Sequence, residues 1–140
     1  PVPAIKDRAA RILNAVFPRM TLGNEIENTM LTRDPAVWAE FEKDNLRHTL
    51  ISSGIYLGMM ESFEVTLSRA TEITLPTFLQ MSETDPVVST PKAKEFFQAI
   101  SSPNKRIVLY GDGACHESYN DIHREIAFQD LEKNLKGFIK

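Results

Sequence analysis

The pattern of apolar and polar positions divides the chain into two parts of different character. In the first part, apolar residues recur every three to four positions, which predicts amphipathic helices. In the second part, short apolar runs alternate with amphipathic stretches, which predicts strand, helix, strand and helix in that order. We therefore predict an all-helical region over residues 1–68 and an α/β region over residues 69–140.

The predicted helices of the first part begin and end at residues typical of helix boundaries. Pro18 ends the first helix, residues 4–17, because proline cannot continue a helix. Asp34 and Pro35 begin the second helix as its N-cap and first helical residue. Residues 18–33 show no clean periodicity, which predicts a loop with a short helix in it.

The longest predicted helix, residues 49–69, carries an apolar residue at every fourth position. Gly54 and Gly58 each weaken this helix by up to about 1 kcal/mol relative to alanine. Because glycine permits close contact between helices, we interpret the apolar stripe as packing on a neighbouring helix. The stripe consists of Ile51, Ile55, Met59, Phe63 and Leu67.

The predicted strands of the second part cover residues 73–81 and 106–110. The second strand holds a continuous apolar run, as expected of a parallel strand that is covered on both faces. Two parallel strands leave both sheet edges unpaired, so we expect further strands elsewhere in the protein. The intervening helix, capped by Thr90, should face the sheet with Ala93, Phe96, Phe97 and Ile100, and the last helix, from about Asp121, should bury Ile122, Ile126, Leu131, Leu135 and Phe138.

Composition and charge are those of an ordinary globular chain and exclude several classes of protein. Of the 140 residues, 42% are hydrophobic and 25% are charged, and a net charge of −3 without a long basic run argues against nucleic acid as a partner. The single cysteine, Cys115, excludes an internal disulfide and a multi-cysteine zinc site. No apolar run approaches the roughly 20 residues of a membrane span, and no signal peptide is visible, so we expect a cytoplasmic location.

A histidine and an aspartate each follow a predicted strand. His116 comes after the second strand and a Gly-Asp-Gly turn at residues 111–113, and Asp85 comes after the first strand. The two residues are separated by about the length of one strand–helix–strand unit, roughly 30 residues. Because parallel strands end at the same edge of a sheet, we expect these side chains to meet there.

Two interpretations of this pair are open from the residues alone. Asp85 and His116 supply two members of a Ser-His-Asp triad, in which the carboxylate orients the imidazole and the imidazole takes a proton from a serine. Alternatively, Asp85 is a turn residue before Pro86 and His116 is an ordinary loop residue. In α/β-hydrolases the chain order is nucleophile, acid and histidine, and here the acid precedes the histidine.

Other candidate chemistries near the pair are weaker. Cys115 is adjacent to His116 in sequence, but neighbours rarely project toward each other, so we interpret it as a small packed thiol. His116, Glu117 and His123 fit no recognised metal-ligand spacing, and we expect neither a metal nor a cofactor. Glu117 and Arg124 either orient the histidine loop or are surface charges, and we favour surface charges.

Two segments of this sequence resemble the monoacylglycerol lipase/lysophospholipase group of α/β-hydrolases. These are ITLPTFLQMSETDPVVSTPKAKEFFQ and YGDGACHESYNDIHREIAFQDLEKNLKGFI, with the signatures D-P-V-V and H-E-x-x-N-D-x-x-R. The resemblance covers residues 72–140 well and implies Asp85 as triad acid and His116 as triad histidine. Residues 1–70 resemble the helical cap of the group more loosely, best at Thr32-Arg33-Asp34-Pro35.

The sequence departs from this group in two ways. Ser82 stands where the group often has glycine, which reduces the freedom of the turn but removes no catalytic group. The nucleophile motif G-x-S-x-G is absent, as is the segment that supplies the oxyanion hole. Since Pro1-Val2-Pro3 resembles the point just before the cap, we expect the chain to be the C-terminal part of a longer hydrolase. The missing N-terminal segment would then supply the serine.

The expected fold is therefore the C-terminal part of an α/β-hydrolase sheet, two parallel strands with helices, preceded by a helical cap or lid. The resemblance implies a serine-type carboxylic ester hydrolase acting on lysophospholipid or monoacylglycerol-like substrates, with this chain inactive alone. The alternative is a non-catalytic α/β module that binds a hydrophobic ligand or a protein partner. Some cap residues are expected to line an acyl channel or a rim on the membrane surface, and most to form cap core: Met20, Leu22, Met30, Trp38, Met59, Met60 and Phe63.

Overall fold

The computed structural model describes residues 4–138, which form two compact units. The first unit contains residues 4–25 and 46–69, and the second contains residues 26–45 and 70–138. Each unit is therefore built from two separate stretches of the chain. Among the described residues, no helix combines the length and the hydropathy needed to cross a membrane.

The two units differ from the predicted regions in one segment. The sequence pattern predicts a single boundary between residues 68 and 69, whereas residues 26–45 pack with the C-terminal α/β part. The reason is that this segment is held by hydrogen bonds to residues about 80 to 90 positions later, such as Thr32 Oγ1 to the Asn120 carbonyl with a separation of 88. A local sequence pattern does not record contacts at such a distance.

The sequence pattern predicts that the first unit is all helical, but the unit also contains two short strands. Strand β1 (Thr21–Gly23) pairs antiparallel with β2 (Leu50–Ser52), and helices α1 (Ala4–Val16) and α4 (Ser53–Ser68) complete the unit. The predicted long helix begins at Ser53 because the Ser52 side chain caps it, accepting a hydrogen bond from the Ile55 amide at 3.2 Å. Strands of three residues are too short to show alternation, which explains the wrong prediction.

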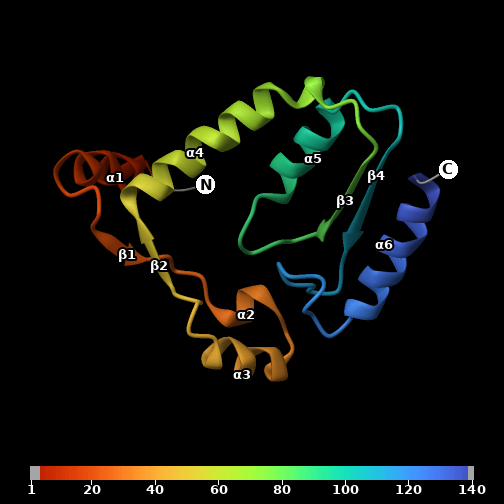
Figure 1. Cartoon of the computed structure of the whole chain (residues 1–140), viewed down its shortest axis with the longest axis horizontal. Coiled ribbons are helices and arrows are strands. Elements are labelled where there is room, and N and C mark those ends of the chain that lie inside the picture. Colours follow the sequence, from red (N-terminus) through yellow and green to blue (C-terminus); the bar gives the residue numbers. More distant parts are fainter. Residues whose placement is uncertain (1–3, 139–140) are drawn as a thin grey trace. The chain divides into compact units, whose positions relative to one another are not determined.

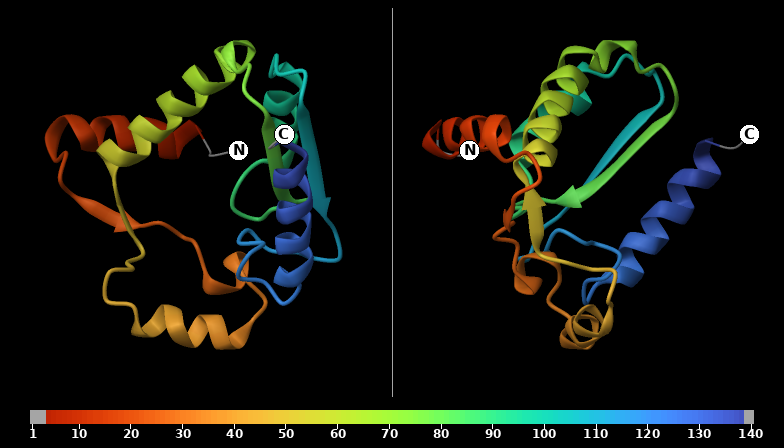
Figure 2. Two further views of the ribbon diagram at one scale, coloured as in Figure 1. Left: turned by 45° about the vertical axis from the view of Figure 1, so that its right-hand side comes forward. Right: turned by 60° about the vertical axis from the view of Figure 1, so that its left-hand side comes forward.

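Helices α1 and α4 pack against each other within this unit (Figure 2). A Cβ atom on Gly54 would lie 3.1 Å from Asn14 Oδ1, whereas a Cβ atom on Gly58 would meet nothing within 4 Å. The predicted close approach of a neighbouring helix is therefore confirmed at Gly54 only. The prediction that the apolar stripe is buried is wrong for Ile55, Met59 and Phe63, whose side chains are 45–60% exposed. Along the stripe from Ile55 to Phe63, these side chains lie about 100° to about 180° around the helix from Gly54, the position that approaches α1.

The two glycines of α4 give a matched pair of substitutions. Gly58→Ala should stabilise the chain by about 0.5–1 kcal/mol, because alanine loses less backbone entropy in a helix and the new methyl group meets open space. Gly54→Ala should gain less or destabilise, because Asn14 must move to admit the methyl group. Thermal unfolding of both variants measures this, and equal midpoints would contradict the contact with α1.

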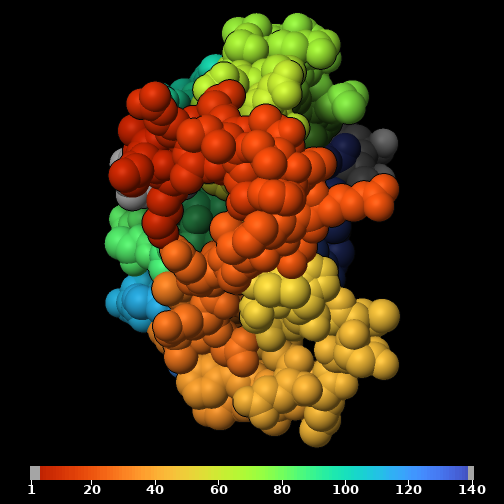
Figure 3. Space-filling view, turned by 90° about the vertical axis from the view of Figure 1, so that its left-hand side faces the viewer, coloured from red at the N-terminus to blue at the C-terminus, as the bar shows by residue number. Residues whose placement is uncertain are grey.

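Many apolar side chains of the first unit are exposed. In Figure 3 the atoms of α1 and β1, drawn in red to orange, lie at the molecular surface and face the viewer. The expected core position is therefore wrong for Met20, Leu22, Met59 and Phe63, each about half exposed. Two further residues of that set, Met30 and Trp38, belong to the second unit. The other exposed apolar side chains of α1 and the segment after it are Ile5, Ile12, Val16 and Phe17.

The second unit is a two-stranded parallel sheet with helices, which confirms the predicted fold class. Strand β3 pairs with β4 from Thr77 opposite Lys105 to Ser82 opposite Tyr110. Helices α5 and α6 lie on opposite sides of these strands (Figure 1). The elements of the unit are α2 (Asn28–Leu31), α3 (Pro35–Lys43), η1 (Ala70–Glu72), β3 (Thr77–Ser82), α5 (Thr90–Ala99), β4 (Lys105–Tyr110) and α6 (Arg124–Phe138).

The predicted element boundaries in this unit need three corrections. Strand β3 begins after Pro76, which has no amide to donate to the ladder. Helix α5 is capped by Ser89, whose hydroxyl accepts from the Lys92 amide at 3.4 Å, and not by Thr90. Helix α6 begins at Arg124 and buries Ala127 and Asn134.

The predicted buried face of α6 is wrong for Ile122, Ile126 and Leu135, each about half exposed. Two strands spaced by about 4.8 Å make a surface narrower than a helix with its side chains, about 10 Å across. The described sheet therefore covers only part of the apolar surface of α6.

Candidate active site

The site lies where the two parallel strands end side by side. Ser82 and Tyr110, the last residues of β3 and β4, are directly opposite each other. Each strand continues into a loop, one carrying Asp85 and the other His116. The common edge of the sheet therefore brings together two residues that are 31 positions apart in the chain.

Asp85 is held by its own turn and faces His116. Its side chain is only 1% exposed, and Oδ1 accepts hydrogen bonds from the amides of Val87 at 2.8 Å and Val88 at 2.9 Å. The other oxygen, Oδ2, lies 2.8 Å from His116 Nδ1. These bonds fix the direction of the carboxylate, so the predicted meeting of Asp85 and His116 is observed.

The pairing with Asp85 determines which ring nitrogen of His116 carries the proton. An ionised carboxylate only accepts hydrogen bonds, so in the neutral ring Nδ1 is the donor and Nε2 keeps a free lone pair. The His116 side chain is 33% exposed, which leaves the ring accessible from one side. This arrangement suits a general base whose orientation is set by a buried acid.

The turn before His116 requires unusual backbone conformations. Asp112 and Gly113 have φ values of 52° and 71°, in the left-handed region that glycine and aspartate tolerate best. After this turn, the His116 amide donates to the Met30 carbonyl at 3.1 Å, and the Glu117 amide donates to the Leu31 carbonyl at 2.8 Å. The histidine loop is therefore supported by the end of α2.

Ser82 connects the acid strand to the histidine loop. Its side chain is fully buried, and Oγ donates to the Ala114 carbonyl at 2.6 Å while accepting from the Thr84 amide at 3.2 Å. The serine that replaces glycine in the sequence resemblance therefore adds a contact between the two loops. It is not a nucleophile in this arrangement, because its hydroxyl is enclosed.

Replacing Ser82 with alanine should destabilise the second unit by about 1–3 kcal/mol, because it removes a buried hydrogen bond and leaves the Ala114 carbonyl without this donor. The matched control is Ser62→Ala, which removes an exposed hydroxyl that donates to the Gly58 carbonyl. Urea unfolding measures both variants. Equal small losses for the two serines would contradict the connecting role of Ser82.

The other sequence candidates do not join the dyad. Cys115 is a buried thiol, as expected, with Sγ 3.3 Å from the Thr29 carbonyl, and burial raises its pKa. His123 is exposed in the turn before α6. No group of three or more histidine, cysteine, aspartate or glutamate side chains among residues 4–138 is arranged to hold a metal ion.

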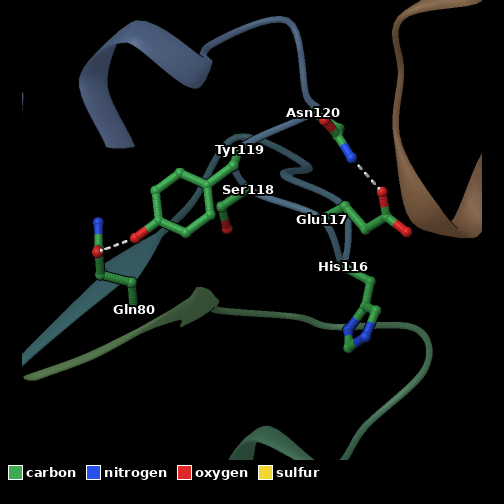
Figure 4. Close-up of a pocket in the computed structure, with 6 residues that line it drawn as sticks. All are labelled: Gln80, His116, Glu117, Ser118, Tyr119 and Asn120. Atoms are coloured by element: carbon green, nitrogen blue, oxygen red, sulfur yellow. Dashed lines mark hydrogen bonds between the residues drawn. The ribbon is translucent and has the colours of Figure 1, made fainter. Parts of the chain in front are cut away.

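A pocket of about 220 Å³ lies beside the histidine loop (Figure 4). On one side Tyr119 reaches toward Gln80 and donates a hydrogen bond to its Oε1 atom. On the other side the Asn120 amide donates to Glu117 at 2.6 Å, so Glu117 is tied within its own loop. The lining residues are Gln80, His116, Glu117, Ser118, Tyr119 and Asn120.

Sequence reasoning missed the contribution of residues 29–34 to this site. Arg124, which we interpreted as a surface charge, forms an ion pair with Asp34 at 2.9 Å. Arg33 forms a second ion pair with Asp121 at 2.5 Å. The only signal was that both partners lie in family-like signatures, Arg33 and Asp34 in T-R-D-P and Asp121 and Arg124 in N-D-x-x-R.

Comparison with known families and sequences gives one family and two relatives. The sequence model of the family described as serine aminopeptidase, S33, matches residues 1–123. An uncharacterized abhydrolase domain-containing protein of Dictyostelium discoideum is 24% identical over 99% of this chain. The uncharacterized protein YnbC of Escherichia coli K12 is 30% identical over 79% of it. The chain spans 14% and 19% of the lengths of these relatives.

Two solved structures have a similar fold. A monoacylglycerol lipase of Paleococcus ferrophilus matches 96% of this chain with a TM-score of 0.84 and 21% identity. A soluble variant of monoglyceride lipase from Saccharomyces cerevisiae, in complex with a substrate analog, matches 96% with a TM-score of 0.74 and 15% identity. The chain spans 53% and 50% of these structures. The family match and these structural matches confirm the expected α/β-hydrolase fold, which the two lipases share.

Proposed function

Because this chain belongs to the serine aminopeptidase S33 family and has an α/β-hydrolase fold, we propose that it carries the acid and the general base of a serine-type carboxylic ester hydrolase. The observation that carries the proposal is the 2.8 Å contact between the buried Asp85 carboxylate and His116 Nδ1. In this proposal Asp85 and His116 are catalytic residues, and neither a metal nor a cofactor takes part.

The proposed mechanism uses His116 twice. Its Nε2 atom removes the proton of a serine hydroxyl as the serine attacks the ester carbonyl, and Asp85 stabilises the imidazolium that forms. The imidazolium then gives this proton to the departing alcohol, leaving an acyl-enzyme. Water attacks the acyl-enzyme in the same way, so His116 again accepts a proton and returns it to the serine.

The nucleophile in this proposal comes from a segment outside the 140 residues. The support is that the sequence contains no G-x-S-x-G motif, the usual position of the serine in this fold. The same outside segment would supply the oxyanion-hole donors. Asp85 and His116 alone therefore constitute an incomplete catalytic apparatus.

A lipid-like monoester, lysophospholipid or monoacylglycerol, is the proposed substrate class. Two lipases of similar fold support it. The exposed apolar side chains of α1 and β1 suit contact with acyl chains or with a membrane surface. We propose a cytoplasmic protein that contacts membranes peripherally.

A non-catalytic α/β module that binds a hydrophobic ligand or partner is the second candidate. The half-exposed apolar residues of α6 and the turn before it favour this alternative, because such surfaces mark interaction sites. The two candidates differ in what they require of His116. A binding module does not need its imidazole, whereas a hydrolase loses activity without it.

The purified 140-residue chain should show no hydrolysis of a p-nitrophenyl ester, because it lacks the nucleophile serine. The full-length protein should react with a fluorophosphonate probe, and the label should be lost when the serine of an upstream G-x-S-x-G is mutated. Hydrolysis by the isolated chain that His116→Ala abolishes would overturn the missing-nucleophile proposal. A full-length protein with no G-x-S-x-G and no labelling would favour the binding module.

A further inference from the structure

We propose that Arg33 and Asp121 are positioning residues that clamp the histidine loop, residues 111–121, so that His116 stays in register with Asp85. The inference rests on the proposed function for the catalytic role of His116. It adds two residues outside the dyad, one of them from the segment that the sequence pattern assigns to the cap.

Arg33 bridges the two ends of the histidine loop. Its Nε atom donates to both carboxylate oxygens of Asp121, at 3.1 and 3.0 Å, and Nη2 donates to Oδ2 at 2.5 Å. Its remaining terminal nitrogen, Nη1, donates to the Asp112 carbonyl at 2.6 Å. Since Asp112 lies near the start of the loop and Asp121 ends it, one guanidinium ties both ends, with His116 between them.

The Asp121 carboxylate accepts hydrogen bonds both from Arg33 and from the histidine loop. Its side chain is 3% exposed, and Oδ1 accepts from the Arg33 amide at 2.9 Å in addition to the guanidinium. Its Oδ2 atom also lies 3.5 Å from the Cys115 amide, one residue before His116. The carboxylate therefore reaches the part of the loop that carries the imidazole.

The segment that holds Arg33 is itself fixed against the loop. Thr32 is fully buried, and its hydroxyl donates to the Asn120 carbonyl at 2.8 Å, next to Asp121. The Trp38 indole donates to the Thr32 carbonyl at 2.9 Å. Arg33 is therefore presented from a rigid backbone, as a clamp requires.

The loop needs support because glycine in its turn permits other backbone conformations, whereas the contact between His116 and Asp85 depends on direction. Asp112 and Gly113 take left-handed conformations, and glycine there leaves the backbone many alternatives. The hydrogen bond between His116 Nδ1 and Asp85 weakens steeply when its length or angle changes. Small movements of the loop would therefore separate His116 from Asp85. Arg33 opposes such movements because it holds both ends of the loop at once.

The test is the NMR signal of the His116 Nδ1 proton in the 140-residue chain labelled with 15N-histidine, which requires no catalytic activity. The unchanged chain should show this proton downfield and protected from exchange with water, and Asp85→Asn should remove it. Arg33→Ala should also remove it. Arg33→Lys, which keeps the charge but has one donor group, should retain it with roughly tenfold faster exchange.

The control is Arg11→Ala, which breaks the exposed Arg11–Asp7 ion pair of the first unit and should leave the signal unchanged. If Arg33→Ala unfolds the second unit, which is seen as loss of near-ultraviolet circular dichroism, that variant is not used. In that case the exchange rate of the His116 Nδ1 proton in Arg33→Lys alone tests the clamp. A signal that Asp85→Asn removes but that exchanges equally slowly in the Arg33 variants would overturn the clamp only. A signal indifferent to Asp85→Asn would overturn the dyad itself.

Discussion

Under the proposed function, replacing His116 with alanine in the full-length protein should lower kcat by about 10⁴-fold or more, with a much smaller change in KM. The imidazole transfers protons in the transition state, whereas substrate binding depends on other surfaces. Asp85→Asn should have an effect of about 10⁴-fold as well, because an amide cannot select the Nδ1-protonated form of the ring that places the lone pair on Nε2. Steady-state hydrolysis of a monoacylglycerol measures both.

The matched control for this prediction is His123→Ala. His123 lies in the same region of the chain but is exposed and outside the dyad, so its loss should leave kcat nearly unchanged. The double variant of Asp85 and His116 should be no worse than His116→Ala, since the two side chains act as one unit. Equal activity of the His116→Ala and His123→Ala variants would contradict the catalytic role of His116.

Replacing Arg33 with alanine should destabilise the second unit by about 3 kcal/mol or more. The substitution leaves the Asp121 carboxylate buried without its cation, and an uncompensated buried charge is costly. Urea unfolding followed by circular dichroism measures the free energy of unfolding. Arg11→Ala, at an exposed ion pair, should change it little, and a similar loss in both variants would show that Asp121 does not depend on Arg33.

The stability that the Arg33–Asp121 ion pair contributes should decrease at low pH. Burial acts to raise the pKa of Asp121, but the hydrogen bonds and charge of Arg33 more than offset this and lower the pKa from 3.8 to about 2. Since the folded state holds the proton less tightly than the unfolded state, the pair stabilises the fold fully above pH 3.8. This stabilisation, about 2 kcal/mol, should be lost as the pH falls through 2.

Urea unfolding between pH 2 and 5 measures this loss. Asp121→Asn is the matched variant, because it keeps the shape of the side chain and removes the titrating group. The difference in stability between the unchanged chain and Asp121→Asn should therefore shrink as the pH falls. A difference that stays constant over this range would contradict the lowered pKa of Asp121.

Position along the sequence was sufficient to place Asp85 and His116 at one sheet edge, whereas their roles as acid and base came from the family resemblance. Asp85 and His116 each follow an apolar strand, and a strand–helix–strand unit has only one common way of aligning two parallel strands. The meeting of their side chains follows from this local order, because the sheet edge is built from neighbouring segments. The Gly-Asp-Gly turn likewise shows its conformation in its composition.

The support of the dyad could not be predicted in this way. Arg33 and Asp121 are 88 positions apart, and neither residue shows in its local pattern that it will be paired. Charged residues in polar stretches are usually solvated, which is why the ion pair of the partly exposed Arg124 with Asp34 was not foreseen. Short strands such as β1 and β2 were missed because three residues do not reveal a period.

The sequence by itself determined the strand–helix–strand–helix order of the α/β part and which two side chains face the common end of its parallel strands. Those properties depend on local periodicity, turn chemistry and the geometry of one parallel crossover. The tertiary structure alone decided that residues 26–45 join the α/β unit and that their arginine holds the histidine loop. Such contacts depend on which distant segments become neighbours after folding, and that is settled by packing of the whole unit rather than by any local preference.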